Sequence, residues 1–316
     1  MTDRPNLCIQ IGLHKTGTTM FNSEFYPKHS DIHHLGKPYD LDDPVRMLLE
    51  EIIYATPLSF DADKCHRLFQ EFVLPHLSAN KLVTINEARL SHGIGVDRSA
   101  VAQRLHAVFG RCKILLVLRR QDEFLRALYF QWAGTNKTDL RFHEWLSESW
   151  VFSRPAPFSR IDYHDIVNSF SAVFGRDQIG VFTYEEFLED RDTFARKLSA
   201  FAGIDAHETV RLLSAKARNP RMSRLHVFVR KHPALARLAQ SIRTRGSKRL
   251  VAALGWVANR SGRADAAMTP ALEERLRTFV GESNLKLAQE YGVPLARYGY
   301  PLPIASAAAS ASHAQS

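Results

Sequence analysis

The sequence predicts an α/β protein with a central, mostly parallel β-sheet and a helical C-terminal part. Four short apolar runs show little alternation, which is typical of parallel strands that are covered on both faces. These runs span residues 7–11, 81–85, 113–118 and 178–182. Stretches with helical spacing separate the runs, and an alternation of strands with helices indicates an α/β domain.

The predicted helices follow the third and fourth runs, where apolar residues recur at helical spacing over 124–132 and 187–201. A final amphipathic helix is predicted over 270–290. We expect residues 1–303 to form one domain, with a basic helical segment at 209–264 inside it. The low-complexity tail, 304–316, is predicted to be disordered.

The composition limits the class of protein. The chain has 316 residues, of which 45% are hydrophobic, enough for a sizeable core. Three cysteines cannot form a disulfide framework. The opening segment lacks a signal-peptide pattern, and no window approaches about 18 consecutive apolar residues. A cytoplasmic protein with reduced thiols and no membrane span is therefore expected.

The positive charge is concentrated in one stretch. The chain has 42 Lys and Arg against 33 Asp and Glu, a net charge of +9. Fourteen of the basic residues and none of the acidic ones lie in 209–264, so the remainder carries 28 − 33 = −5. Such a stretch can be a solvated face, guide an acidic acceptor such as a polysaccharide, or contact an anionic membrane surface peripherally. Its few aromatic residues argue against nucleic acid as a partner.

The strongest motif follows the first predicted strand. A Gly- and Thr-rich turn leads from this strand into a helix, an arrangement that binds anions through backbone N–H groups and the helix N-terminus. Its residues are Gly12, Leu13, His14, Lys15, Thr16, Gly17, Thr18 and Thr19. Lys15 adds a full positive charge, and the threonines add hydroxyl donors. The plain alternative is a strand-to-helix turn with a capping threonine.

This loop differs from the nucleotide-binding loop of kinases and hydrolases. That pattern ends in Gly-Lys-Ser/Thr, whereas here Lys15 comes before Gly17 and the loop is one step shorter. The shorter loop suits a single phosphate group. A kinase or nucleotide hydrolase therefore stays a less favoured alternative.

The loop resembles the 5′-phosphosulfate loop of sulfotransferases that use 3′-phosphoadenosine 5′-phosphosulfate (PAPS), a family with a P-loop-like three-layer α/β/α fold. The resemblance implies that Lys15 contacts the 5′-phosphosulfate and offsets charge on the leaving phosphate. It also implies that Gly17, Thr18 and Thr19 hold the 5′-phosphate. His14 and Thr16 lie inside the same loop and are further cofactor-binding candidates, and His14 is expected mainly to shape the loop. A fixed cation at the departing oxygen suits the chemistry of sulfuryl transfer.

A second motif, over 113–129, resembles the 3′-phosphate site of the same family. That site has an arginine at a strand end, matched by Arg119, and a serine eight residues later, where this chain has Ala127. Alanine has no hydroxyl to donate, so another group must supply the contact or the site is weaker. Arg120 and Arg126 are nearby candidates, and Lys216, Arg218 or Arg221 could also reach the phosphate. Alternatively, Arg119 and Arg120 pair with Asp122 and Glu123 on the surface.

Two later segments extend the resemblance to most of residues 6–303, though only the first two motifs are specific. Tyr184 follows the fourth run, where a tyrosine of the family commonly lies near the adenine, so Tyr184 is a candidate for stacking. A core tyrosine is the alternative. The segment 298–301 resembles bacterial members, but the Arg-Lys-Gly triplet of cytosolic members is absent from this sequence.

Sulfuryl transfer to a hydroxyl needs a base, and Glu87 is the first candidate. It follows the second predicted strand, where catalytic residues of open α/β sheets collect. His33, beside His34 and Lys37, is the second candidate. Each of these groups could instead be structural. The histidine and cysteine spacing does not predict a metal site.

The sequence therefore predicts a metal-independent sulfotransferase that uses PAPS and releases 3′-phosphoadenosine 5′-phosphate (PAP). The expected acceptor is a hydroxyl of a carbohydrate or small metabolite. Besides the kinase or hydrolase, a binding protein that kept the fold and lost the chemistry remains open, and Ala127 is the feature that favours it.

Overall fold

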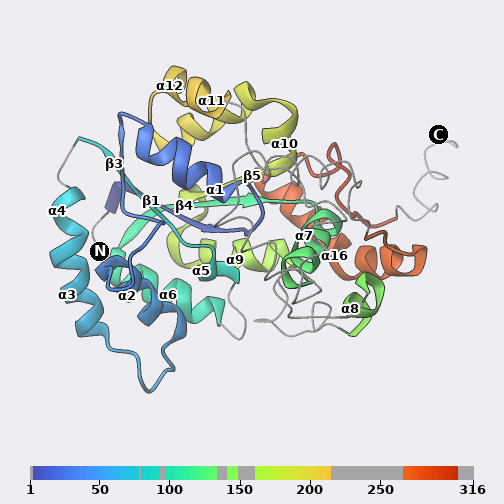
Figure 1. Ribbon diagram of the computed structural model, residues 1–316, viewed down its shortest axis with the longest axis horizontal. Helices are drawn as coiled ribbons and strands as arrows, with labels where there is room; N and C mark the ends of the chain where they lie inside the picture. The colour runs from blue at the N-terminus through green and yellow to red at the C-terminus, as the bar shows by residue number, and fades with distance from the viewer. Residues whose placement is uncertain are drawn as a thin grey trace, which may run out of the picture. The chain divides into compact units, whose positions relative to one another are not determined.

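The computed structural model describes residues 3–77, 80–92, 97–133, 141–148, 161–214 and 266–304. Its sheet has five strands in the order β2-β3-β1-β4-β5, and all four pairings are parallel (Figure 1). The strands are β1 (Asp3–Gly12), β2 (Ile32–His34), β3 (Leu82–Asn86), β4 (Arg111–Leu118) and β5 (Ile179–Thr183). The predicted α/β class with a parallel sheet is confirmed.

The helices fall between these strands and after the last one. Those before β4 are α1 (Thr18–Met20), α2 (Pro44–Tyr54), α3 (Ala62–Phe72), α4 (Leu74–Leu77), α5 (Arg89–His92) and α6 (Arg98–Phe109). Those after β4 are α7 (Gln121–Ala133), α8 (Phe142–Glu148), α9 (Tyr163–Phe174), α10 (Tyr184–Glu189), α11 (Arg191–Ala202), α12 (Ala206–Ser214) and α16 (Pro270–Tyr291). The helix predicted over 270–290 is thus confirmed.

The chain divides into two compact units. The first contains Met1–Arg120, Trp150–Ala215 and Leu276–Ser316, and the second contains Gln121–Ser149 and Lys216–Arg275. The predicted single domain over 1–303 stays a prediction. The basic segment beyond residue 214, up to residue 264, and the predicted tail from residue 305 lie outside the described residues.

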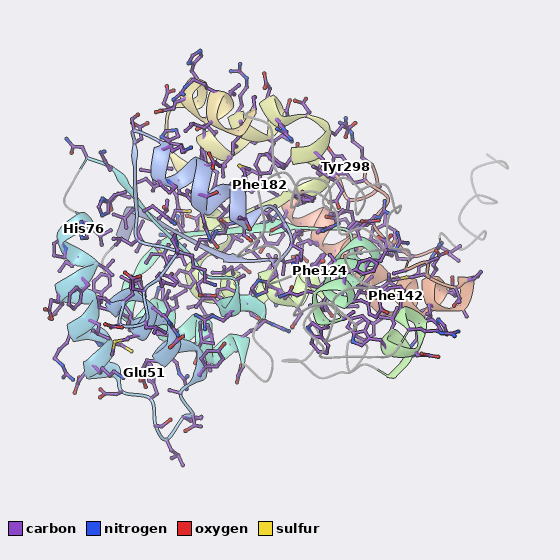
Figure 2. All side chains as sticks on the ribbon, viewed as in Figure 1. Glu51, His76, Phe124, Phe142, Phe182 and Tyr298 are labelled. Atoms are coloured by element: carbon purple, nitrogen blue, oxygen red, sulfur yellow. The ribbon has the colours of Figure 1, made fainter. Side chains whose placement is uncertain are left out.

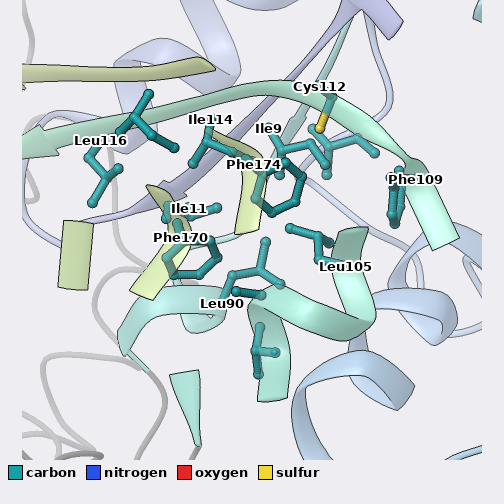
Figure 3. Close-up of a cluster of buried hydrophobic side chains, with 14 of the residues drawn as sticks. Ile9, Ile11, Leu90, Leu105, Phe109, Cys112, Ile114, Leu116, Phe170 and Phe174 are labelled. Atoms are coloured by element: carbon teal, nitrogen blue, oxygen red, sulfur yellow. The ribbon is translucent and has the colours of Figure 1, made fainter. Parts of the chain in front are cut away.

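One face of the sheet packs on α6 and α9. Alternate strand residues, among them Ile9 and Ile114, meet Leu105 of α6 and Phe170 of α9 in a buried cluster (Figure 3). Burial of each large apolar side chain contributes about 1.5–3 kcal/mol. Leu13 belongs to this cluster, which anchors on one side the loop over residues 12–19. We call this loop the phosphate loop, after the ligand that the sequence predicts for it.

The other face packs on α11, α12 and the turn after α1. Leu115 and Phe182 of the sheet meet Phe194 of α11, and Phe21 lies 6.4 Å from Phe194 between ring centroids. In Figure 1, α11 and α12 lie above β1 and β4, whereas α3 and α6 lie below them. Because Phe21 comes two residues after the end of the phosphate loop, the loop is anchored to the cores of both faces.

The second unit contains α7 and α8, whose aromatic side chains pack together. The ring centroids of Tyr129 and Phe142 are 5.3 Å apart, and those of Trp132 and Trp145 are 5.7 Å apart. Within the part of the chain that the structure describes, no helix combines the length and the apolar character that a membrane crossing requires.

Candidate active site

The phosphate loop is closed by its own hydrogen bonds. The buried Thr16 donates its Oγ1–H to the carbonyl of Leu13 (2.7 Å), and the Leu13 N–H donates to the carbonyl of Val117 on β4 (3.1 Å). Lys15 and Gly17 both have left-handed backbones, with φ of 66° and 82°. Such turns direct consecutive N–H groups toward one point, where an anion can bind.

The predicted side chains of the loop differ in exposure. Lys15 and Thr19 are exposed, while His14 and Thr18 are half-buried. Thr16 is fully buried and its hydroxyl is engaged by the Leu13 carbonyl, so the side chain of Thr16 shapes the loop.

Three separately predicted residues meet at this loop. Arg119 donates from Nη1 to the carbonyl of Lys15 (3.0 Å), and its Cζ lies 5.5 Å from the ring centroid of Tyr184. A Cβ placed on Gly17 would lie 3.3 Å from Cε2 of Tyr184. The loop, the end of β4 and the start of α10 therefore form one cationic and aromatic corner.

Hydrogen bonds from α9 and from the segment after α16 support this corner. Tyr163 donates its Oη–H to the carbonyl of Arg119 (2.6 Å). Glu185 accepts from the Arg120 N–H (2.9 Å) and from the Oη–H of Tyr300 (2.8 Å). Arg120 is thus tied through its backbone to the segment that resembles bacterial family members.

Ala127 lies on α7, in the second unit, where it is half-buried. Arg126, a candidate to replace the missing serine hydroxyl, lies 3.0 Å from Glu123 and 3.5 Å from Asp122 in ion pairs along the same helix. Its charge is therefore partly compensated within α7. The other candidates, Lys216, Arg218 and Arg221, lie outside the described residues.

A pocket of ≈ 770 Å³ opens on the other side of the loop. It is formed by the turn after β1, the segment after β2, α2 and the segment after β3. Its lining residues are Thr18, Thr19, Asn22, Ser23, Lys37, Pro38, Tyr39, Arg46, Glu50 and Arg89. Since Thr18 and Thr19 belong to the phosphate loop, the pocket begins where the loop ends.

Glu87 lies beneath this pocket, fully buried at the end of β3. Its Oε1 accepts from Lys37 Nζ (3.1 Å) and from the Arg89 N–H (3.0 Å), and its Oε2 accepts from Arg89 Nη2 (2.8 Å). Burial works to raise the pKa of Glu87, but the bonds from Arg89 and the charge of Lys37 outweigh it and hold the pKa below its ordinary value. Glu87 is therefore ionised at neutral pH.

Glu50 is a second carboxylate, and it lines the pocket itself. Its Oε1 accepts from Arg46 Nε (3.0 Å) and Arg89 Nη1 (3.2 Å), so Arg89 bridges Glu50 and Glu87. The bond from Arg46 lowers the pKa of Glu50 despite partial burial. The sequence reasoning missed Arg46, Glu50 and Arg89. The available signals were the i, i+4 spacing of Arg46 with Glu50 and the position of Arg89 two residues after Glu87.

The two neighbouring histidines are not among the residues that line the pocket, although His34 bonds to the carbonyl of Lys37, which does line it (3.2 Å). His33 stacks on His76 of α4 with 4.2 Å between ring centroids, and Figure 2 shows His76 on that helix. Burial, with the charges of His76 and Lys81, lowers the pKa of His33. His34 bonds to Thr84 Oγ1 (2.9 Å), and burial lowers its pKa as well. Strand alternation turns His33 toward α4, so the structure does not bring it together with Lys15 and Glu87.

Among the described residues, no group of three His, Cys, Asp or Glu side chains gathers in a way that could hold a metal ion.

The fold resembles solved structures of one class. The crystal structure of the sulfotransferase from Alicyclobacillus acidocaldarius superposes with a TM-score of 0.56 at 18% identity, and the match covers 94% of this chain and 99% of that chain. This chain has the sulfotransferase fold. A sulfotransferase domain from the curacin biosynthetic pathway (11% identity, 69% of this chain, 80% of that chain, TM-score 0.41) also matches. Mouse sulfotransferase SULT7A1 complexed with PAP matches as well (15% identity, 69% of this chain, 70% of that chain, TM-score 0.40).

Comparison with protein-family models gives no match, and comparison with curated proteins gives none either. Within the sulfotransferase fold of this chain, the phosphate loop follows the central strand β1. Arg119 and Tyr184 follow β4 and β5 on one side of it, and Lys37 and Glu87 follow β2 and β3 on the other.

Proposed function

We propose that this protein is a sulfotransferase that takes its sulfuryl group from PAPS and transfers it to an acceptor hydroxyl of a carbohydrate or small metabolite. The observation that carries the proposal is the convergence of Lys15, Arg119 and Tyr184 on one corner of a sulfotransferase fold. The predicted cytoplasmic location is part of the proposal.

The residues of this corner fit a nucleotide with two phosphate groups. Lys15 would hold the 5′-phosphosulfate and Arg119 the 3′-phosphate, while the ring of Tyr184 offers a face for the adenine. Gly17 leaves open the space that a Cβ would fill beside Tyr184. When bound, PAPS supplies a sulfuryl group whose bond to the phosphate oxygen breaks as the bond to the acceptor oxygen forms. Lys15 stabilises the charge on the departing oxygen.

The proton of the acceptor hydroxyl goes to a carboxylate in this proposal, and the pocket offers two. Glu87, the residue predicted from the sequence, has both oxygens engaged by Lys37 and Arg89 and lies beneath the lining. Glu50 lines the pocket directly. The pH dependence of turnover in Glu87→Gln and Glu50→Gln variants separates a base, whose loss removes the acidic limb, from a positioning group, whose loss lowers the rate at every pH.

A second candidate function is a nucleotide-binding protein without transferase activity. Ala127 favours it, because the family pattern has a hydroxyl at this position and alanine has none. In this case PAP binds, and no acceptor is sulfated.

Titration calorimetry with PAP tests the proposal. We expect a dissociation constant of about 10 µM or tighter, and no dependence on Mg²⁺. Sulfate transfer from PAPS to a panel of sugars and small alcohols then distinguishes the enzyme from the binding protein. Mg²⁺-dependent binding of ATP in place of PAP would instead favour a kinase or hydrolase.

A further inference from the structure

The pocket beside the phosphate loop has an excess of positive charge. Three cationic side chains line it, those of Lys37, Arg46 and Arg89. Two carboxylates face these cations, Glu50 in the lining and Glu87 beneath it. Three minus two leaves one formal positive charge among the described residues of the pocket.

Ion pairs hold the cations in place and leave part of each side chain exposed. Lys37 is held by Glu87 at 3.0 Å and stays 36% exposed. Arg46 and Arg89 are held by Glu50 at 3.0 and 3.2 Å and stay 30% and 25% exposed. Because the geometry of the cations is fixed before a ligand arrives, little ordering is needed when an anionic group binds them.

The neutral part of the lining suits a molecule with many hydroxyl groups. Thr18, Thr19, Asn22 and Ser23 supply donors and acceptors along one wall. The amide of Asn22 is fixed, because its Oδ1 accepts from Nδ2 of the buried Asn86 (2.8 Å). The ring of Tyr39 and the aliphatic parts of the long side chains add apolar surface, which the carbon face of a sugar ring can cover.

We propose that the acceptor is a polyhydroxylated molecule that carries one anionic group, a carboxylate or a sulfate ester, beside the hydroxyl that is sulfated. The anionic group binds Lys37, Arg46 and Arg89, and the reacting hydroxyl points to Thr18 and Thr19 on the phosphate loop. This inference rests on the proposed function and narrows its acceptor class. Glu87 orients Lys37 and Arg89 and so positions these cations, whichever of the two carboxylates takes the proton.

The test compares four acceptors with PAPS: methyl glucuronide, its neutral methyl ester, glucose 6-sulfate and an apolar phenol. We expect at least one of the two monoanions to exceed the ester in kcat/KM by about tenfold or more, since a charge-assisted contact is lost in the ester. Equal values for the ester and both monoanions, or preferential turnover of an apolar phenol, would overturn the inference.

Variants of Lys37 test whether the preference for an anionic acceptor arises in this pocket. Lys37→Gln should clearly lower the ratio of anion to ester, because one of the three cations is lost, and Lys37→Arg should restore most of it. Lys64→Gln is the matched control. Lys64 forms an ion pair with Glu51 at 2.9 Å and is 38% exposed, but it does not line the pocket. A ratio that is unchanged in a folded Lys37→Gln protein, or that falls equally in Lys64→Gln, places the anion elsewhere and overturns the inference.

Direct binding keeps the inference separate from the proposed function. Methyl glucuronide, its methyl ester and glucose 6-sulfate are titrated with and without PAP. Failure of PAP to bind counts against the proposed function alone, because the pocket can still be titrated with methyl glucuronide. If PAP binds and neither monoanion binds more tightly than the ester, the proposed function stands and the acceptor class is wrong.

Discussion

The two sides of the phosphate loop hold their cations in different ways. On the β4–β5 side, Arg119 is oriented by a backbone carbonyl and an aromatic ring. On the β3–β2 side, Lys37 and Arg89 are oriented by the carboxylate of Glu87. The carboxylates of Glu50 and Glu87 offset most of the positive charge on the second side, which fits an acceptor with a single anionic group. The contacts of Arg119 instead join the phosphate loop to the ring of Tyr184, which fits a nucleotide that has both a phosphate and a base.

Removal of Glu87 should have the largest effect and tests whether its side of the loop depends on paired charges. Glu87→Ala removes the buried carboxylate that pairs with Lys37 and leaves Arg89 with Glu50 alone, and breaking this buried ion-pair network costs about 3–5 kcal/mol of unfolding free energy. Chemical denaturation of the wild type and the variant at pH 7 measures this change in unfolding free energy. A loss below about 1 kcal/mol would show that the ion pairs contribute little.

Glu87 should also make the stability of the fold fall as the pH falls. The folded-state pKa of Glu87 lies below its ordinary value of 4.5, so the carboxylate stabilises the fold above that pH. This stability is lost as the pH falls toward the lowered value. The melting temperature of the wild type should therefore fall more steeply below about pH 4.5 than that of Glu87→Gln. Parallel curves would contradict the ionised state.

Replacement of Lys15 should affect chemistry more than folding. Lys15→Ala should lower the rate of sulfate transfer by about 10²–10³, because the departing oxygen loses its fixed cation. Single-turnover measurement with PAPS gives this rate. Lys28→Ala is the control, since Lys28 is exposed and pairs with Glu24 on the turn that follows α1. A normal rate in Lys15→Ala would remove the proposed role.

Arg119 tests the nucleotide side of the comparison. Arg119→Ala should weaken the binding of PAP by about 1.5–3 kcal/mol through the loss of a charged contact to phosphate. Arg111→Ala is a control on the same strand, because Arg111 lies at the other end of β4 and pairs with Asp177. Titration calorimetry with both variants should show a loss of PAP affinity for Arg119→Ala alone.

Gly17 should give the smallest effect and separates backbone strain from contact. Gly17→Ala and Gly292→Ala both place a side chain on a left-handed backbone (φ 82° and 66°), so each should lose about 1–2 kcal/mol of stability. The added Cβ contacts Tyr184 only at position 17, and at position 292 nothing lies within 4 Å. Only Gly17→Ala should therefore weaken PAP binding. Equal PAP affinities of the Gly17→Ala and Gly292→Ala variants would show that Tyr184 is not part of the nucleotide site.

Most of the sheet could be predicted because its strands are dense in apolar residues. The 113–118 run became β4 (Arg111–Leu118), and 81–85 became β3 (Leu82–Asn86). The strand β2 was missed, since its three residues, Ile32–His34, include two histidines and are too few to show a pattern. Its place in the sheet comes from pairing with β3, which is a tertiary contact.

The site also has a part that could be predicted from the sequence and a part that could not. The positions of Lys15, Arg119 and Tyr184 at strand ends could be predicted, because parallel strands bring their carboxyl ends to one edge. The ion pairs of Arg46, Glu50 and Arg89 join α2 to the segment after β3, and no local pattern shows that contact. Glu87 was found at the expected strand end, but its burial depends on Lys37 and Arg89.

The central position of β1 also has a kinetic consequence for the proposed reaction. The residues that would hold the sulfuryl donor follow β1, β4 and β5, whereas the cations that would hold the acceptor follow β2 and β3 or lie on α2. Neither molecule must leave before the other arrives. The strand order thus favours direct transfer in a ternary complex over a ping-pong route through a sulfated side chain, and initial rates should give intersecting rather than parallel double-reciprocal lines.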